Sequence, residues 1–101
     1  MKVIMILEKN IHCEYEDAKK YIKLALEHKD LGDTELAKMF YDLAEGEIKD
    51  AEKMHDMAVK IINKVKAEQG TSPAGMMEFY TLIHERDIED AKEVEMLMDR
   101  Y

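Results

Sequence analysis

Residues that interrupt a helix are scarce in this chain and fall in two places. The 101 residues include one proline and four glycines, and apart from Gly46 these lie within residues 29–34 and 68–75. β-Branched residues are sparse, and apolar residues recur at helical spacing elsewhere, so the sequence predicts an all-α fold. We expect helices over about residues 3–29, 34–68 and 73–100.

The two interruptions contain the residues that commonly end and begin helices. In K-D-L-G-D-T, Gly32 suits a C-cap, and Asp33 or Thr34 suits the N-cap of the following helix. In E-Q-G-T-S-P-A-G, a glycine again precedes an N-cap serine, Ser72, with Pro73 as the first helical residue. Because the connections are short, neighbouring helices are expected to be antiparallel within one domain, residues 1–101.

Charge and cysteine content restrict the partners and the compartment. The formal net charge of −8 argues against binding to nucleic acid or to an anionic membrane. The lone Cys13 cannot form an internal disulfide, which suits a reducing cytosol. The longest apolar run near the start, V-I-M-I-L, is too short for a signal sequence or a membrane span. We therefore expect a soluble, cytoplasmic protein.

Two carboxylates interrupt the apolar stripe of the second predicted helix. The stripe passes through Glu47 and Asp50. An ionised carboxylate removed from water without a partner is costly or becomes neutral. Either this part of the face is hydrated, or a positive group meets it. The apolar members of the stripe are Leu36, Phe40, Leu43, Ala51, Met54, Ala58, Ile61 and Val65.

A short pattern occurs once in each predicted helix: acid, apolar, charged, Asp, Ala, charged, charged, apolar. It begins at Glu14, Glu47 and Asp87. Chance is one explanation, because helix-rich chains reuse Glu, Lys and Ala. The other is that the acids have a common purpose, since each first acid lies on the apolar stripe of its own helix.

Helical geometry predicts that several of these acids meet. Each helix folds back on the one before it at the turn between them, and each residue rises by about 1.5 Å along the helix axis. On this basis, four acids fall at one level along the bundle: Glu14, Glu47, Asp50 and Asp90. Asp87 falls one turn away, near the level of His55. Carboxylates from three helices at one level repel one another unless a cation lies among them. Oxygen ligands of this kind favour iron, manganese, magnesium or calcium.

The first two predicted helices resemble those of ferritin-like proteins, the ferritins, bacterioferritins and rubrerythrins. Glu14 is followed by Tyr21 seven residues later and by Glu47 thirty-three residues later, within the phrase L-A-E-x-E-x-x-x-A-E. The resemblance implies that Glu14 binds a metal, that Glu47 bridges two metals and that Tyr21 packs beside the site. Asp87 and Asp90 would take the ligand positions of the family's last helix.

Two departures from that family affect the expected chemistry. The family's Glu-x-x-His becomes Glu47-x-x-Asp50 and Asp87-x-x-Asp90, and one of the usual four helices is absent. We therefore expect a three-helix antiparallel ferritin-like bundle that is completed by dimerisation. His84 precedes Asp87 by one turn and is a second-tier ligand candidate, as is His55 of the Glu52-x-x-His55 motif; both are also ordinary helix-flank histidines.

Two functions are consistent with these residues. The first is a metal-binding protein that holds non-haem iron or manganese, as a di-iron oxidase or ferroxidase would, and acts as a homodimer or an assembly of dimers. The second is a structural or interaction bundle without metal, in which the inward acids pair with Lys or Arg or line a hydrated interface. The expected metal ligands are Glu14, Glu47, Asp50, Asp87 and Asp90, with Tyr21, His84 and His55 as a second tier.

Overall fold

The computed structural model describes residues 2–69 and 76–101, with side chains described at residues 2–68 and 81–101. Its three helices are α1 (Lys2–Asp30), α2 (Thr34–Gln69) and α3 (Met76–Asp99). They form a rod of 57 × 18 × 17 Å. The described ranges contain no strand, which confirms the all-α fold. The predicted start of the third helix at Ser72 and Pro73 lies outside the described residues.

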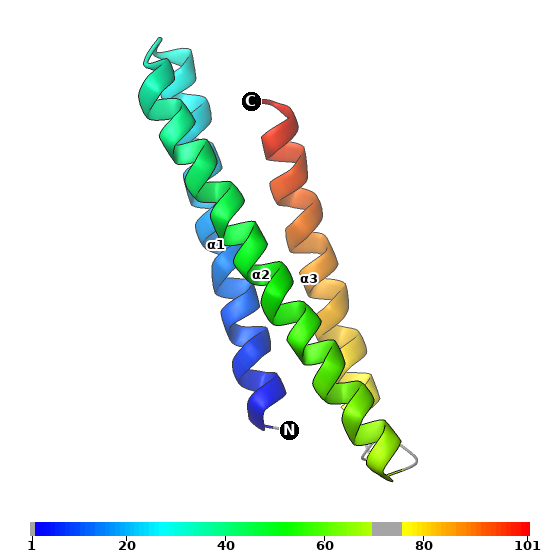
Figure 1. The fold of residues 1–101 in the computed structure, drawn as a ribbon. Coiled ribbons are helices and arrows are strands. Elements are labelled where there is room, and N and C mark those ends of the chain that lie inside the picture. Colours follow the sequence, from blue (N-terminus) through cyan, green and yellow to red (C-terminus); the bar gives the residue numbers. More distant parts are fainter. Residues whose placement is uncertain (1, 70–75) are drawn as a thin grey trace.

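The helices run up, down and up along the rod. Helices α1 and α2 form an antiparallel hairpin, and α3 returns in the direction of α1, so that the C-terminus lies at the end of the rod that holds the α1–α2 turn (Figure 1). Helix α1 packs along both of the other helices, whereas α2 and α3 contact each other sparsely. A groove of about 380 Å³ consequently runs between α2 and α3.

The residues of the α1–α2 turn explain its backbone conformation. Gly32 has a φ of 84°, which a residue without a Cβ adopts at no steric cost. The amide of Gly32 donates to the carbonyl of Lys29 and that of Asp33 to the carbonyl of His28, at 3.0 and 2.9 Å. This is the Schellman pattern that ends a helix. The carboxylate of Asp33 then accepts a hydrogen bond from the amide of Leu36 at 3.2 Å, so Asp33, rather than Thr34, is the N-cap of α2.

Small side chains at heptad spacing form the α1–α2 contact. One line of fully buried positions recurs every seven residues in each helix: Ile4, Ile11, Ala18 and Ala25 in α1, and Ala37, Ala44, Ala51 and Ala58 in α2. An alanine at each level lets the two helix axes approach closely. The predicted stripe is therefore buried at Ala51 and Ala58. Its edge through Leu43, Glu47 and Asp50 lies on a flank instead, where Leu43 is 42% exposed and Asp50 is exposed.

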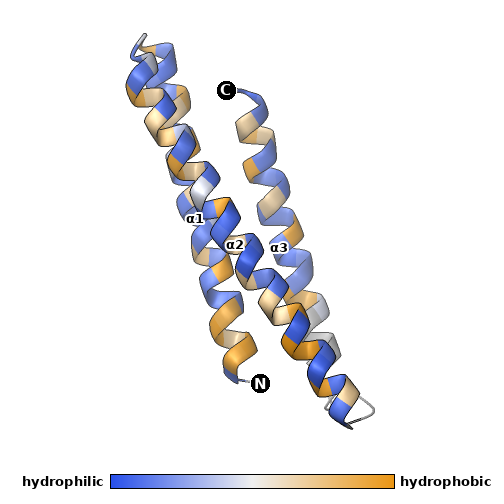
Figure 2. Ribbon diagram, viewed as in Figure 1, coloured by the Kyte–Doolittle hydropathy of each residue, from blue (hydrophilic) through white to orange (hydrophobic). Residues whose placement is uncertain are grey.

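Large apolar side chains remain exposed over the described part of the chain. Val3, Met5 and Ile6 are 45–57% exposed, and the first turns of α1 that carry them are strongly hydrophobic (Figure 2). Leu82 in α3 is 66% exposed. Across the searched residues, no helix combines the length and apolar character that crossing a membrane requires.

Candidate functional site

Three of the four acids predicted to share a layer come together. One carboxylate oxygen from each of Glu14, Glu47 and Asp50 lies within 4.8 Å of the other two. Glu14 and Glu47 are half-buried, and Asp50 is exposed. None of the three makes an ion pair or side-chain hydrogen bond within the described residues, and Oε2 of Glu14 is shielded from solvent as well. These three side chains, which we call the acidic cluster, form a concentration of uncompensated negative charge between α1 and α2.

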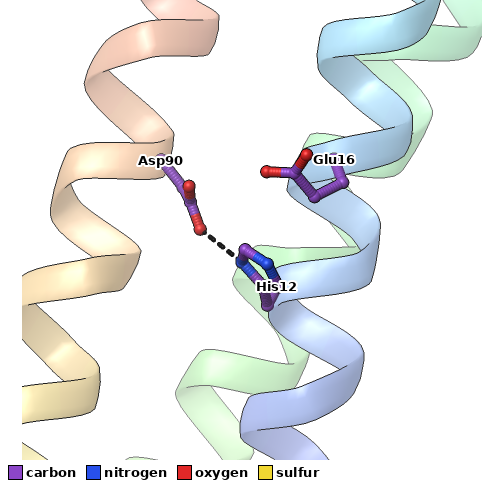
Figure 3. A group of neighbouring side chains, drawn as sticks. All are labelled: His12, Glu16 and Asp90. Atoms are coloured by element: carbon purple, nitrogen blue, oxygen red, sulfur yellow. Dashed lines mark hydrogen bonds and ion pairs between the residues drawn. The ribbon is translucent and has the colours of Figure 1, made fainter.

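Asp90 was expected in this layer and belongs to a different group. Its Oδ1 accepts a hydrogen bond from Nζ of Lys19 at 2.9 Å, and its Oδ2 accepts one from Nδ1 of His12 at 2.8 Å. Lys19 also contacts Glu16 at 2.9 Å and Glu93 at 2.7 Å. Figure 3 shows Asp90 on α3 facing His12 and Glu16 on α1. Asp90 does not join the acidic cluster because α3 packs on the flank of α1 away from Glu14.

The groups around Asp90 already neutralise its charge. Although burial acts to raise it, hydrogen bonds from His12 and Lys19 hold the pKa of Asp90 below its usual value. Burial likewise acts to lower the pKa of Lys19, but hydrogen bonds to Glu93, Glu16 and Asp90 raise it above its usual value. His12, Glu16 and Asp90 are close enough to bind a metal, yet the Lys19 ammonium occupies the position of the cation. We therefore read this group as a structural ion-pair network.

Asp87 meets an acid that the sequence did not single out. Asp87 is 5% exposed and Glu8 of α1 is 2% exposed. The oxygens of both carboxyl groups lack any hydrogen-bond donor among the described residues. Burial, followed by the proximity of Asp87, raises the pKa of Glu8 to about 8. The ionised form of Glu8 is costly out of water, and a second carboxyl group beside it adds to that cost.

The two second-tier histidines lie against each other. Nε2 of His55 is 3.3 Å from Nδ1 of His84, and the ring centroids are 5.3 Å apart. Asp87 lines the same cavity as this pair, in agreement with its predicted level. Tyr21 is stacked on Phe40 at 6.3 Å between centroids and lies two turns of α1 from Glu14.

The sequence interpretation missed Glu8 and the roles of His12 and Lys19. With Tyr15, these residues follow i, i+4, i+7, i+11 spacing along α1, which places them on one helix face. That spacing is the signal that could have identified them, since it marks a mostly polar face beside the apolar one. The face is the one that α3 covers, because Glu8, His12 and Lys19 all have their partners on α3.

Comparisons of the chain with protein-family models, curated proteins and solved structures give no match. The ferritin-like resemblance therefore rests on the residues quoted above and stays a prediction. Within the described residues, the fold and side chains define an all-α protein with one uncompensated acidic cluster, one ion-pair network and one buried carboxyl pair.

Proposed function

We propose that this protein binds a divalent metal ion, iron or manganese, at the acidic cluster of Glu14, Glu47 and Asp50. The observation that carries the proposal is the approach of three carboxylate oxygens to within 4.8 Å of one another with no basic partner among the described residues. Like charges at this separation destabilise one another, and a cation among them removes the repulsion. Carboxylate oxygens are the preferred ligands of hard divalent ions.

The site takes its remaining ligands from a second copy of the chain. The acidic cluster lies on the α1–α2 flank that α3 leaves uncovered, and the apolar stripe of α2 surrounds it. Leu43 on that flank is 42% exposed, and Phe40, Met54 and Ile61 are half-buried. An apolar strip of this kind is typical of an interface. A two-fold axis through the strip brings the acids of both chains together, and six carboxylates then suffice for two metal ions.

More specifically, we propose that the bound metal supports an oxidation reaction. A non-haem di-iron oxidase or ferroxidase needs two ions and coordination positions left open for oxygen. The ferritin-like resemblance, in which Glu14 would bind and Glu47 would bridge, supports this activity. The cluster contains no imidazole, so we expect weaker metal affinity than in a site with histidine, and a loss of binding in acid as protons compete for the carboxylates.

Titration of Fe(II) under anaerobic conditions, or of Mn(II), tests the acidic cluster. We expect Glu47→Ala to lose the binding that the wild-type protein shows. Glu45→Ala is the matched control, because it removes the same charge from α2 but lies in the groove that faces α3. Equal stoichiometry in wild type and Glu47→Ala would contradict the proposal.

A structural or interaction bundle is the second candidate function. The observation that favours it is the pairing of Asp90 with Lys19 and His12, which is what that function predicts for inward acids. An ion that binds only the folded state raises the melting temperature. If the protein is a structural bundle without metal, its melting temperature therefore does not change on addition of Fe(II), Mn(II), Mg(II) or Ca(II).

A further inference from the structure

A groove of about 530 Å³ lies between the N-terminal part of α1 and α3. Its apolar lining includes Met5 and Ile6 of α1 and Ile83 of α3. Met5 and Ile6 are 57% and 51% exposed, and the first turns of α1 that carry them are strongly hydrophobic (Figure 2). A mostly apolar groove of this size is typical of sites that bind small ligands.

Basic side chains border this apolar lining, although the formal net charge of the chain is −8. They include Lys2 and Lys9 of α1 and Arg86 of α3. Because the two lysines are seven residues apart, they lie on one side of α1, with Met5 and Ile6 between them. Neither lysine forms an ion pair or side-chain hydrogen bond within the described residues. Their charges are therefore not compensated by the protein part that the structure describes.

Two buried polar groups in the groove also lack hydrogen-bonding partners. Nε of Arg86 is shielded from solvent and has no acceptor among the described residues. Glu8, which is 2% exposed and lines the groove, has no donor for either carboxyl oxygen. Its ionised form is costly there, and burial raises its pKa to about 8, so Glu8 is mostly uncharged at neutral pH. Asp87, the acid beside Glu8, lines the cavity that faces α2 instead.

We propose that this groove binds the anion of a single-chain fatty acid, with its carboxylate at Arg86 and Lys9 and its hydrocarbon chain on Met5, Ile6 and Ile83. The guanidinium group offers donors in the geometry that a carboxylate accepts, and the chain removes exposed apolar side chains from water. An inorganic anion would leave the apolar lining exposed, and a cationic amphiphile would meet the basic side chains. The groove shares no residue with the acidic cluster and does not depend on the function proposed there.

Calorimetric titration with decanoate, below the concentration at which it forms micelles, tests this proposal. Decanol and decyltrimethylammonium carry the same hydrocarbon chain with an uncharged and a cationic headgroup. We expect decanoate to saturate at one equivalent and to bind about 10-fold more tightly than either of them, because only its headgroup accepts hydrogen bonds from the cations.

Three variants separate the headgroup contact from the chain contact. Arg86→Gln is expected to lower the affinity for decanoate to that for decanol and to leave decanol binding unchanged, which shows that the groove is intact. Ile6→Ser is expected to weaken the binding of both. Lys49→Gln is the matched control and is expected to bind as wild type does, because it removes a positive charge from the groove between α2 and α3. Far-UV circular dichroism verifies that each variant is folded.

Cys13 reports whether the ligand lies in this groove. It is an exposed free thiol that lines the groove, so we expect decanoate to slow its alkylation by iodoacetamide. The proposal would be overturned by the absence of saturable decanoate binding, by equal affinities for the three amphiphiles, by unchanged affinity in Arg86→Gln, or by binding that leaves Cys13 unprotected. Alkylation that slows as the protein concentration rises, with no further effect of decanoate, would assign the groove to a second copy of the chain instead.

Discussion

Replacement of Lys19 by methionine tests whether the ion-pair network holds α3 on α1. The Lys19 side chain is 13% exposed, and that of Asp90 is 9% exposed. The variant keeps an apolar stem of similar length and leaves Asp90 with His12 as its remaining partner. Removal of one member of a buried pair costs about 3–5 kcal/mol. We expect a value near 3 kcal/mol, because the His12 contact at 2.8 Å is retained. For a domain of this size, that lowers the melting temperature by about 12–24 °C.

Urea unfolding followed by far-UV circular dichroism measures this free energy. The double variant Lys19→Met/Asp90→Leu replaces the pair with apolar side chains and is expected to recover stability to within about 1 kcal/mol of wild type. Lys38→Met is the matched control, because Lys38 pairs with Asp42 on the exposed surface and such pairs contribute little. If Lys19→Met is no less stable than Lys38→Met, the network does not hold α3 in place.

Four further outcomes follow from the structure. In the presence of EDTA, wild-type stability falls as the pH rises from about 5 to 8, because the pKa of Glu8 is raised from 4.5 to about 8 in the folded state; Glu8→Gln flattens this dependence of the urea midpoint, and identical profiles would contradict it. Glu47→Leu raises the melting temperature of the metal-free protein, since an apolar residue replaces an uncompensated carboxylate, and abolishes any rise on addition of Fe(II) or Mn(II); a rise that persists argues against the acidic cluster. Sedimentation at micromolar concentration gives a dimer that Leu43→Glu dissociates, whereas a folded wild-type monomer of 11.8 kDa would exclude both the interface and the shared site. Gly32→Ala destabilises the chain by about 1–2 kcal/mol in urea unfolding, the cost of a left-handed conformation for a residue with a Cβ; an unchanged midpoint would show that the turn relaxes.

The sequence by itself determined the helices and the turn between the first two. Helical periodicity and the scarcity of breaks act within a few residues, so the predicted ranges 3–29 and 34–68 differ little from α1 (Lys2–Asp30) and α2 (Thr34–Gln69). The turn at Gly32 was equally predictable from the sequence, because its hydrogen bonds join residues five or fewer positions apart. Part of the acidic cluster was also predictable from the sequence. The short turn fixes the register of α1 against α2, and this register brings Glu14 to the level of Glu47 and Asp50.

Only the tertiary structure decided how each helix is rotated about its axis. Hydropathy centred the buried face of α2 on the stripe through Leu43, Ala51 and Met54. The structure buries Ala51 but centres the face on the line through Ala44, Ala51 and Ala58, because small side chains permit closer packing than hydropathy alone indicates. That rotation turns Glu47 onto a flank.

The partners of the buried charges were also decided by the tertiary structure. Lys19 and Asp90 are 71 residues apart in the chain, and Glu8 meets Asp87 across the same α1–α3 interface. The sequence pattern gives Asp87 and Asp90 equivalent places in a metal site. Which flank of α1 receives α3 determines that one acid meets a lysine and the other a second carboxyl group, and this choice depends on the packing of all three helices, which no local pattern encodes.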